Sequence, residues 1–275
     1  MRFLNRNKLI HRIKTIQSYL CAGLDTEMGK LPLHMAKNGE NLVEFNRKII
    51  EATLPFSAAY KINTAFYEQY GSKGWAWMEE TLAHIPDSVF SIADAKRGDI
   101  GNTSTMYARA FFDTLNFDAV TVAPYMGEDS LRPFLEFENK WIICLALTSN
   151  PGHADFQKLN TETEKKLYET VIETVCKWGN PDNLMFVVGA TRAEDIGHVR
   201  SLIPDHFLLV PGVGAQGGSL SEVSKYGLNN DCGLLVNSSR GIIYASNGED
   251  YAEAAATEAN KLQKEMAVLM GNNVT

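Results

Sequence analysis

Short apolar runs alternate with longer stretches of mixed polarity from one end of the chain to the other. The runs contain almost no charged residues, as expected of strands that are buried on both faces. They predict eight β-strands, at residues 19–24, 58–62, 89–96, 119–123, 141–147, 184–188, 207–210 and 233–237.

The segments between these strands repeat apolar residues three to four positions apart, which predicts amphipathic helices. We expect helices at residues 42–52, 66–84, 102–114, 161–178, 192–202 and 250–266, with a short helix after residue 130. Thr161 and Glu164 fit a capping box at the start of the helix over 161–178. The basic N-terminal segment, with Arg6 and Arg12, predicts a surface helix and not a secretion signal.

Eight strand–helix units in about 250 residues predict a (β/α)8 TIM barrel, here with an additional N-terminal helix. A doubly wound open sheet is the main alternative, and it would carry a G-x-G-x-x-G fingerprint after its first strand. The first strand ends instead in Asp25-Thr26-Glu27. No linker, low-complexity tract or internal repeat divides the sequence, so residues 1–275 are expected to form a single barrel domain.

The composition is that of a globular protein with a large core, since 45% of the 275 residues are hydrophobic and 21% are charged. A formal net charge of −7 argues against a nucleic-acid partner but leaves room for a locally basic pocket. The four cysteines form no C-x-x-C pair and are expected to be free thiols in a reducing compartment. No apolar run is long enough for a membrane span, so we expect a cytoplasmic protein.

The end of the third predicted strand has an unusual charge pattern, Asp94-Ala95-Lys96-Arg97-Gly98-Asp99. Asp94 and Lys96 are two positions apart, so they project to the same side of the strand. Crowded carboxylates need a neighbouring cation, and the lysine provides one. Lys61 and Asp25 end the two preceding strands, and TIM barrels place their active sites at such strand ends. A surface salt bridge is the simpler interpretation of Asp94 and Lys96, and a helix N-cap that of Asp99.

The loops after the seventh and eighth strands favour a phosphate ligand. Residues 211–218 contain four glycines around Gln216, and glycine lets backbone N–H groups approach an anion closely. Arg240, beside Gly241, offers a bidentate donor, and this pair of loops is the usual phosphate site of the fold. A plain flexible turn is the alternative for the glycine-rich loop. Ser149 fits either a helix cap or a ligand contact, and the six histidines show no zinc-ligand spacing.

The motifs at these strand ends together resemble a known family. Residues 94–103, 211–218 and 237–242 are similar to the signatures of orotidine 5′-phosphate decarboxylase, and residues 60–68 and 148–152 resemble its longer bacterial branch. The similarity follows the whole chain in order. It implies a carbon–carbon lyase that converts orotidine 5′-monophosphate to uridine 5′-monophosphate and CO2, the last step of pyrimidine synthesis, without a metal or an organic cofactor.

The resemblance also implies roles for individual residues. Lys61, Asp94, Lys96 and Asp99 would form the catalytic charge network, with Lys96 as the proton donor to C6. Asp99 and Thr103 would reach into the site of a neighbouring subunit, so that a homodimer is the functional unit. The substrate-binding residues would be Asp25 and Lys61 for the ribose, Ser149 for the pyrimidine edge, and Gln216, Gly218, Arg240 and Gly241 for the phosphate. Ala123 departs from the pattern, because an asparagine is expected at this position.

Two other functions remain open from the sequence. A magnesium-dependent ketose-phosphate decarboxylase or aldolase of the same fold would be expected to carry a carboxylate at the end of the second strand, where this chain has Lys61. A barrel that binds a nucleotide without catalysis would be expected to lack one of the four network charges, and all four are present. The sequence therefore favours the decarboxylase.

Overall fold

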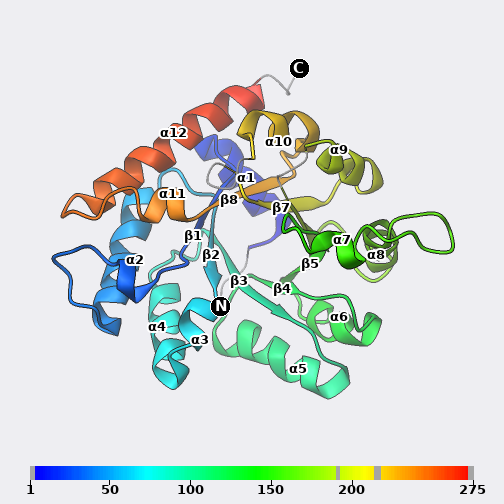
Figure 1. The fold of residues 1–275 in the computed structure, drawn as a ribbon, viewed down its shortest axis with the longest axis horizontal. Coiled ribbons are helices and arrows are strands. Elements are labelled where there is room, and N and C mark those ends of the chain that lie inside the picture. The colour runs from blue at the N-terminus through cyan, green and yellow to red at the C-terminus, as the bar shows by residue number, and fades with distance from the viewer. Residues whose placement is uncertain (1–3, 190–192, 214–217, 272–275) are drawn as a thin grey trace.

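The computed structural model describes residues 4–189, 193–213 and 218–271. Eight parallel strands close into a barrel in sequence order, with β8 paired to β1 (Figure 1). The strands are β1 Leu20–Gly23, β2 Ala59–Asn63, β3 Phe90–Arg97, β4 Ala119–Val122, β5 Trp141–Leu147, β6 Leu184–Val188, β7 Phe207–Pro211 and β8 Leu234–Ser238. The predicted TIM barrel is confirmed, and the open sheet is excluded.

Helices surround the strands on all sides (Figure 1). They are α1 Arg6–Ile16, α2 Gly39–Thr53, α3 Ala65–Glu68, α4 Gly71–Ala83, α5 Gly101–Arg109, α6 Glu128–Leu135, α7 His153–Phe156, α8 Leu167–Val175, α9 Ala193–Leu202, α10 Leu220–Gly227, α11 Arg240–Ile243 and α12 Tyr251–Gly271. A 3-10 turn, Met28–Lys30, precedes α2, and a π-helical turn, Ala110–Thr114, extends α5. Among the residues that the structure describes, no helix is long and apolar enough to cross a membrane.

The additional N-terminal helix is confirmed, and it lies across the N-terminal end of the barrel. Arg6 donates hydrogen bonds to the carbonyls of Pro181 and Asp205, shortly before β6 and β7. Arg12 donates to the carbonyl of Ser57, shortly before β2. Because these carbonyls belong to the loops that enter the strands, α1 covers the end opposite to the predicted site.

The strands are buried over almost their whole length, as their apolar sequence predicts. Apart from Leu145 within β5, exposure increases at the C-terminal ends of β2, β3, β7 and β8. The open end of the barrel is therefore the end that carries the predicted charged residues.

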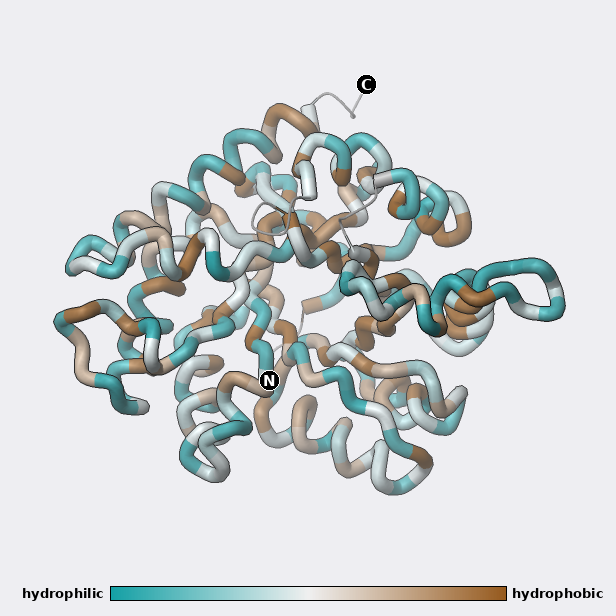
Figure 2. Tube along the Cα trace, viewed as in Figure 1, coloured by the Kyte–Doolittle hydropathy of each residue, from teal (hydrophilic) through white to brown (hydrophobic). Residues whose placement is uncertain are grey.

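Figure 2 shows the segment between α7 and α8 as a hydrophilic arm that projects from the barrel.

Arg200 of α9 fastens the N-terminal end of the last two strands. Its buried guanidinium donates hydrogen bonds to five backbone carbonyls, those of Ile203, Pro204, His206, Gly227 and Gly233. Burial lowers the pKa of Arg200 to about 10, so the group stays charged at neutral pH. These bonds join α9 to the loops that enter β7 and β8.

Two details of the predicted helices are wrong. The helix expected over 66–84 is divided into α3 and α4, because Gly71 adopts φ = 60° at the junction, a left-handed conformation that is accessible to glycine. The capping box of Thr161 and Glu164 does not form, since α8 begins later, at Leu167. Glu169 accepts a hydrogen bond from the backbone N–H of Lys166 and caps this helix instead.

Candidate active site

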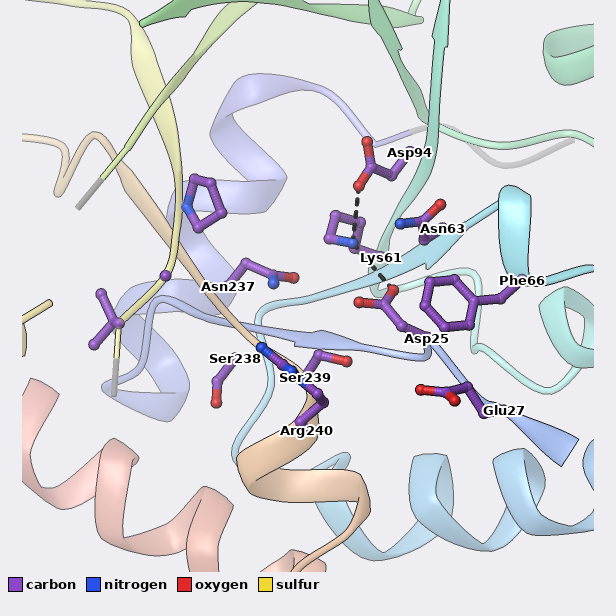
Figure 3. Close-up of a pocket in the computed structure, with 13 residues that line it drawn as sticks. Asp25, Glu27, Lys61, Asn63, Phe66, Asp94, Asn237, Ser238, Ser239 and Arg240 are labelled. Atoms are coloured by element: carbon purple, nitrogen blue, oxygen red, sulfur yellow. Dashed lines mark hydrogen bonds and ion pairs between the residues drawn. The ribbon is translucent and has the colours of Figure 1, made fainter. Parts of the chain in front are cut away.

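Charged side chains from three neighbouring strands meet at the C-terminal end of the barrel. The Nζ of Lys61 lies 3.3 Å from Oδ1 of Asp25 and 3.0 Å from Oδ2 of Asp94. The Nζ of Lys96 lies 2.6 Å from Oδ1 of Asp94. Figure 3 shows Lys61 between the two carboxylates. The strand ends thus bring together Asp25, Lys61, Asp94 and Lys96 as predicted. From here on, the charge network means these four residues and does not include Asp99.

Burial separates the charge network from an ordinary surface salt bridge. The side chain of Lys61 is 5% exposed and that of Asp94 is 12% exposed. Burial alone would raise the pKa of Asp94, but the charges of Lys61 and Lys96 outweigh it and lower this pKa to about 2. Burial alone would lower the pKa of Lys61, but Asp94 and Asp25 outweigh it and raise this pKa. Asp94 is therefore ionised, and Lys61 protonated, at neutral pH.

An irregularity of β3 places Lys96. Ala93 pairs with Val120 of β4, but the next registered pair is Arg97 with Val122, so β3 bulges between them. Lys96 lies in this bulge with φ = 49°, a left-handed conformation that residues other than glycine seldom adopt. The local backbone at Lys96 is therefore strained.

Thr121 of β4 contacts the charge network, although no pattern in the sequence selects it as a site residue. Its Oγ1 accepts a hydrogen bond from the backbone N–H of Lys96 at 2.9 Å and donates one to Oδ1 of Asp94 at 3.0 Å. The residue lies within an apolar strand, and threonine is an ordinary strand residue. Its contacts with Asp94 and Lys96 depend on the neighbouring bulge in β3, which only the structure shows.

Three residues of the charge network, Asp25, Lys61 and Asp94, line a cavity of about 320 Å³ (Figure 3). The side formed by β1 to β3 presents carboxylates and an ammonium, from Asp25, Lys61 and Asp94. The other side is formed by the loops after β7 and β8, and it presents Gly212, Ser238, Ser239 and Arg240. The guanidinium of Arg240 and the serine hydroxyls on one side can bind an anionic group. The ammonium and carboxylates on the other side can bind the polar part of the same ligand.

The predicted phosphate residues are partly described by the structure. Arg240 begins α11 and lines the cavity. Gly218 is buried, and its backbone N–H donates to the carbonyl of Gly212, which closes the glycine-rich loop at its base. Gly241 is exposed in α11. Gln216 lies outside the described residues.

Six of the predicted site residues that the structure describes do not line this cavity, namely Lys96, Asp99, Thr103, Ser149, Gly218 and Gly241. Ser149 is half-buried beyond the end of β5, next to Gly189. Asp99 is half-buried and accepts a hydrogen bond from the backbone N–H of Ile100, while α5 begins after it, so Asp99 is not the helix N-cap. Thr103 is exposed on α5.

Two tyrosines that sequence reasoning missed hold the loop that carries Asp25. The hydroxyl of Tyr244 accepts a hydrogen bond from the backbone N–H of Glu27 at 2.7 Å. The hydroxyl of Tyr67 donates to the carbonyl of Leu24 at 3.2 Å. Burial raises the pKa of Tyr244 to about 12, so it remains neutral. These contacts fix Asp25 from both sides.

The alanine at position 123 keeps the end of β4 in place. Its backbone N–H donates to the carbonyl of Arg97 at 2.8 Å. The pairing of β4 with the end of the β3 bulge therefore does not depend on a side chain at this position.

The fold and the charged cavity at the strand ends define a TIM-barrel enzyme. The family model described as "Orotidine 5'-phosphate decarboxylase / HUMPS family" matches residues 18–255. The chain belongs to this family, and the resemblance found in its sequence is confirmed.

Known relatives extend over nearly the whole chain. A protein of Flavobacterium johnsoniae named orotidine 5'-phosphate decarboxylase is 56% identical over 270 residues, which covers 97% of this chain and 98% of that protein. A protein of Phocaeicola vulgatus with the same name is 52% identical over 97% of this chain and 99% of its own length. The solved structure of Leishmania donovani OMP decarboxylase has a TM-score of 0.81 and 38% identity, and the match covers 95% of this chain and all of that chain.

Proposed function

We propose that this protein decarboxylates orotidine 5′-monophosphate to uridine 5′-monophosphate and CO2, in the synthesis of pyrimidines. The observation that carries the proposal is the charge network, in which two lysines flank the buried carboxylate of Asp94 at the edge of a cavity. The family and the names of its relatives support the same reaction.

In the proposed mechanism, Lys96 meets the charge that develops at C6. The bond between C6 and the carboxylate breaks, CO2 leaves, and the electron pair stays on C6. A fixed ammonium at Lys96 stabilises this carbanion and then transfers a proton to C6, after which solvent reprotonates the amine. Asp94 faces the departing carboxylate and holds both lysines in place, while the remote phosphate supplies binding energy.

The remaining roles follow the sides of the cavity. Asp25 and Lys61 bind ribose hydroxyls. Ser149 contacts the pyrimidine edge from the loop after β5. The phosphate is held by residues of the loops after β7 and β8, namely Gln216, Gly218, Arg240 and Gly241. We further propose that the enzyme needs no metal or organic cofactor and works in the cytoplasm; the buried free thiols of Cys21, Cys144 and Cys232 support a reducing compartment.

The position of Lys61 argues against a magnesium-dependent reaction on a ketose phosphate. A magnesium ion in such a site would be bound by carboxylates at the strand ends. Here the ammonium of Lys61 lies between the carboxylates of Asp25 and Asp94 and takes the place that a metal would need. The ammonium of Lys61 thus repels a divalent cation from the place between the two carboxylates.

We expect the purified protein to convert orotidine 5′-monophosphate at an unchanged rate after treatment with EDTA. The measurement is the loss of orotate absorbance, with uridine 5′-monophosphate identified as the product by chromatography. A ketose phosphate tested with and without magnesium serves as the control substrate. No turnover of the nucleotide, or turnover that requires added magnesium, would contradict the proposal.

We propose that two copies of the chain form a homodimer that shares its active sites. Asp99 and Thr103 lie outside their own cavity, at the start of α5. Five large apolar side chains of α5, of the residue before it and of the segment before α6 are exposed, namely Ile100, Met106, Tyr107, Tyr125 and Met126. Exposed aromatic and methionine side chains are enriched in subunit interfaces. A second copy docked here would bring its own Asp99 and Thr103 to the first.

We expect a mixture of inactive Lys96→Ala and Asp99→Ala proteins to regain activity when their subunits exchange. A heterodimer with shared sites would contain one site in which both substitutions fall together and one in which neither does. The measurement is turnover after co-incubation, with exchange followed by mass spectrometry of isotope-labelled chains. Proven exchange without recovery would show that Asp99 acts within its own chain.

A further inference from the structure

The bulge in β3 has a single residue of β4 opposite it. Ala93 pairs with Val120 and Arg97 pairs with Val122, so the three residues 94–96 of β3 face Thr121 alone. Both Asp94 and Lys96 lie within this bulge. A bulge is specified by the residue that satisfies its unpaired backbone groups, and that residue here is Thr121.

The hydroxyl of Thr121 forms hydrogen bonds with both Lys96 and Asp94. It accepts the backbone N–H of Lys96 at 2.9 Å and gives its only proton to Oδ1 of Asp94 at 3.0 Å. The same carboxylate oxygen receives the Nζ of Lys96 at 2.6 Å. Thr121, Asp94 and Lys96 therefore form a closed ring of contacts, in which the backbone N–H of Lys96 binds Thr121 and the Nζ of Lys96 binds the carboxylate oxygen to which Thr121 donates.

This ring explains how Lys96 keeps a strained conformation. Its φ of 49° persists only where the surroundings determine it, and strained backbone of this kind occurs at functional sites. The Lys96 side chain is 48% exposed, so little packing holds the ammonium. The hydrogen bond from the Lys96 N–H to Thr121 fixes the backbone from which the lysine side chain extends. The hydrogen bond from Thr121 to Asp94 fixes the carboxylate that binds the Nζ of Lys96.

The alternative is that Thr121 is an ordinary residue of a buried strand. Its neighbours in β4, Val120 and Val122, are apolar and completely buried, as is Thr121 itself. Valine has the same shape as threonine and would fill this place without a polar group to satisfy. Packing alone therefore does not explain a hydroxyl at this position, whereas its hydrogen bonds to Lys96 and Asp94 do.

We propose that Thr121 is a positioning residue for decarboxylation, which holds the Lys96 ammonium and the Asp94 carboxylate in register with C6 of the substrate. The inference rests on the proposed function. Thr121 does not touch the substrate in this scheme and acts only through its two partners. It does not contribute to binding of the ribose or the phosphate, which other strands provide.

The test compares Thr121→Val with Thr121→Ser. Valine keeps the shape and removes the hydroxyl, and we expect kcat to fall by about 10- to 100-fold, the effect of one hydrogen bond to a charged group, while KM changes little. Serine keeps the hydroxyl and is expected to retain most of the wild-type kcat. Thr53→Val is the matched control, because the buried hydroxyl of Thr53 bonds to Ile49 and Tyr60, far from the charge network.

A pH profile separates positioning from a loss of stability. The charged groups that face Asp94 are Lys61 from β2 and Lys96 from β3, with Asp25 behind Lys61. Since Thr121 donates to the ionised form of Asp94, its removal should move the acidic limb of kcat/KM to higher pH in Thr121→Val. The limb should stay in place in Thr121→Ser and Thr53→Val.

The outcomes are distinct. Wild-type kcat in Thr121→Val, an equal loss in Thr53→Val, or no rescue by serine would overturn the proposal for Thr121. Failure of the wild-type protein to decarboxylate the nucleotide would overturn the proposed function instead, and thermal unfolding of every variant shows whether the comparison is made between folded proteins.

Discussion

Replacing Lys96 with alanine is expected to lower kcat by about 10⁴-fold or more, because it removes both the charge that stabilises the carbanion and the proton that quenches it. The Lys96 ammonium lies 2.6 Å from Asp94, and its side chain is the more solvent-exposed of the two network lysines. The measurement is steady-state turnover of orotidine 5′-monophosphate.

Binding of the product should distinguish a catalytic role from a structural one. Uridine 5′-monophosphate is held by the opposite side of the cavity in the proposed function, so Lys96→Ala should bind it within a few-fold of the wild-type affinity. Lys261→Ala, a change at a surface lysine of α12 paired with Glu258, is the matched control and should retain full kcat. A Lys96→Ala protein that keeps about a tenth of the wild-type kcat would refute the assignment of Lys96 as proton donor.

Replacing Asp94 with asparagine is expected to lower kcat by about 10²- to 10³-fold, the scale of losing one preorganised electrostatic contact. The substitution keeps the size of the side chain and removes the anion between Lys61 and Lys96. The two lysines then repel each other, and Lys96 loses the partner that directs its Nζ. Asp182→Asn, on the turn before β6, is the control for an exposed aspartate at the other end of the barrel.

The same substitution has a pH signature in stability. The pKa of Asp94 falls from an ordinary 3.8 to about 2, so the ionised group stabilises the folded protein above pH 3.8 and loses this effect as the pH falls towards 2. The contribution is about 2 kcal/mol. In urea unfolding, the wild type should exceed Asp94→Asn in stability at neutral pH, and the difference should shrink across this acidic window. A difference that does not depend on pH would contradict the lowered pKa.

Much of the fold could be predicted from the sequence, because strands buried on both faces appear as continuous apolar runs. The charge at the strand ends also identified Asp25, Lys61, Asp94 and Lys96 as neighbours, since parallel strands of a barrel end at one rim. Because neighbouring strands in the sequence are also neighbours in the barrel, the contact between these four residues could be predicted from local sequence patterns alone.

What could not be predicted depends on backbone geometry. The bulge of β3 leaves no mark in the sequence, because Lys96 is not the glycine that a left-handed φ usually requires. Thr121 was therefore indistinguishable from any other strand threonine. The capping box at Thr161 failed for a related reason: Glu164 takes φ = 60° in a turn, and a local motif does not show that the chain folds back before α8 begins.

The guanidinium of Arg200 binds the loops that enter β7 and β8, whereas the charge network lies at the opposite end of the barrel, where β1, β2 and β3 end. One group binds only backbone carbonyls, which any sequence provides, and the other binds only specific side chains. The loops of the rim can therefore diverge in evolution, and the barrel can acquire new substrates, without disturbing the attachment of its last strands. Directed evolution of this enzyme can accordingly vary the rim loops outside the charge network while position 200 is left unchanged.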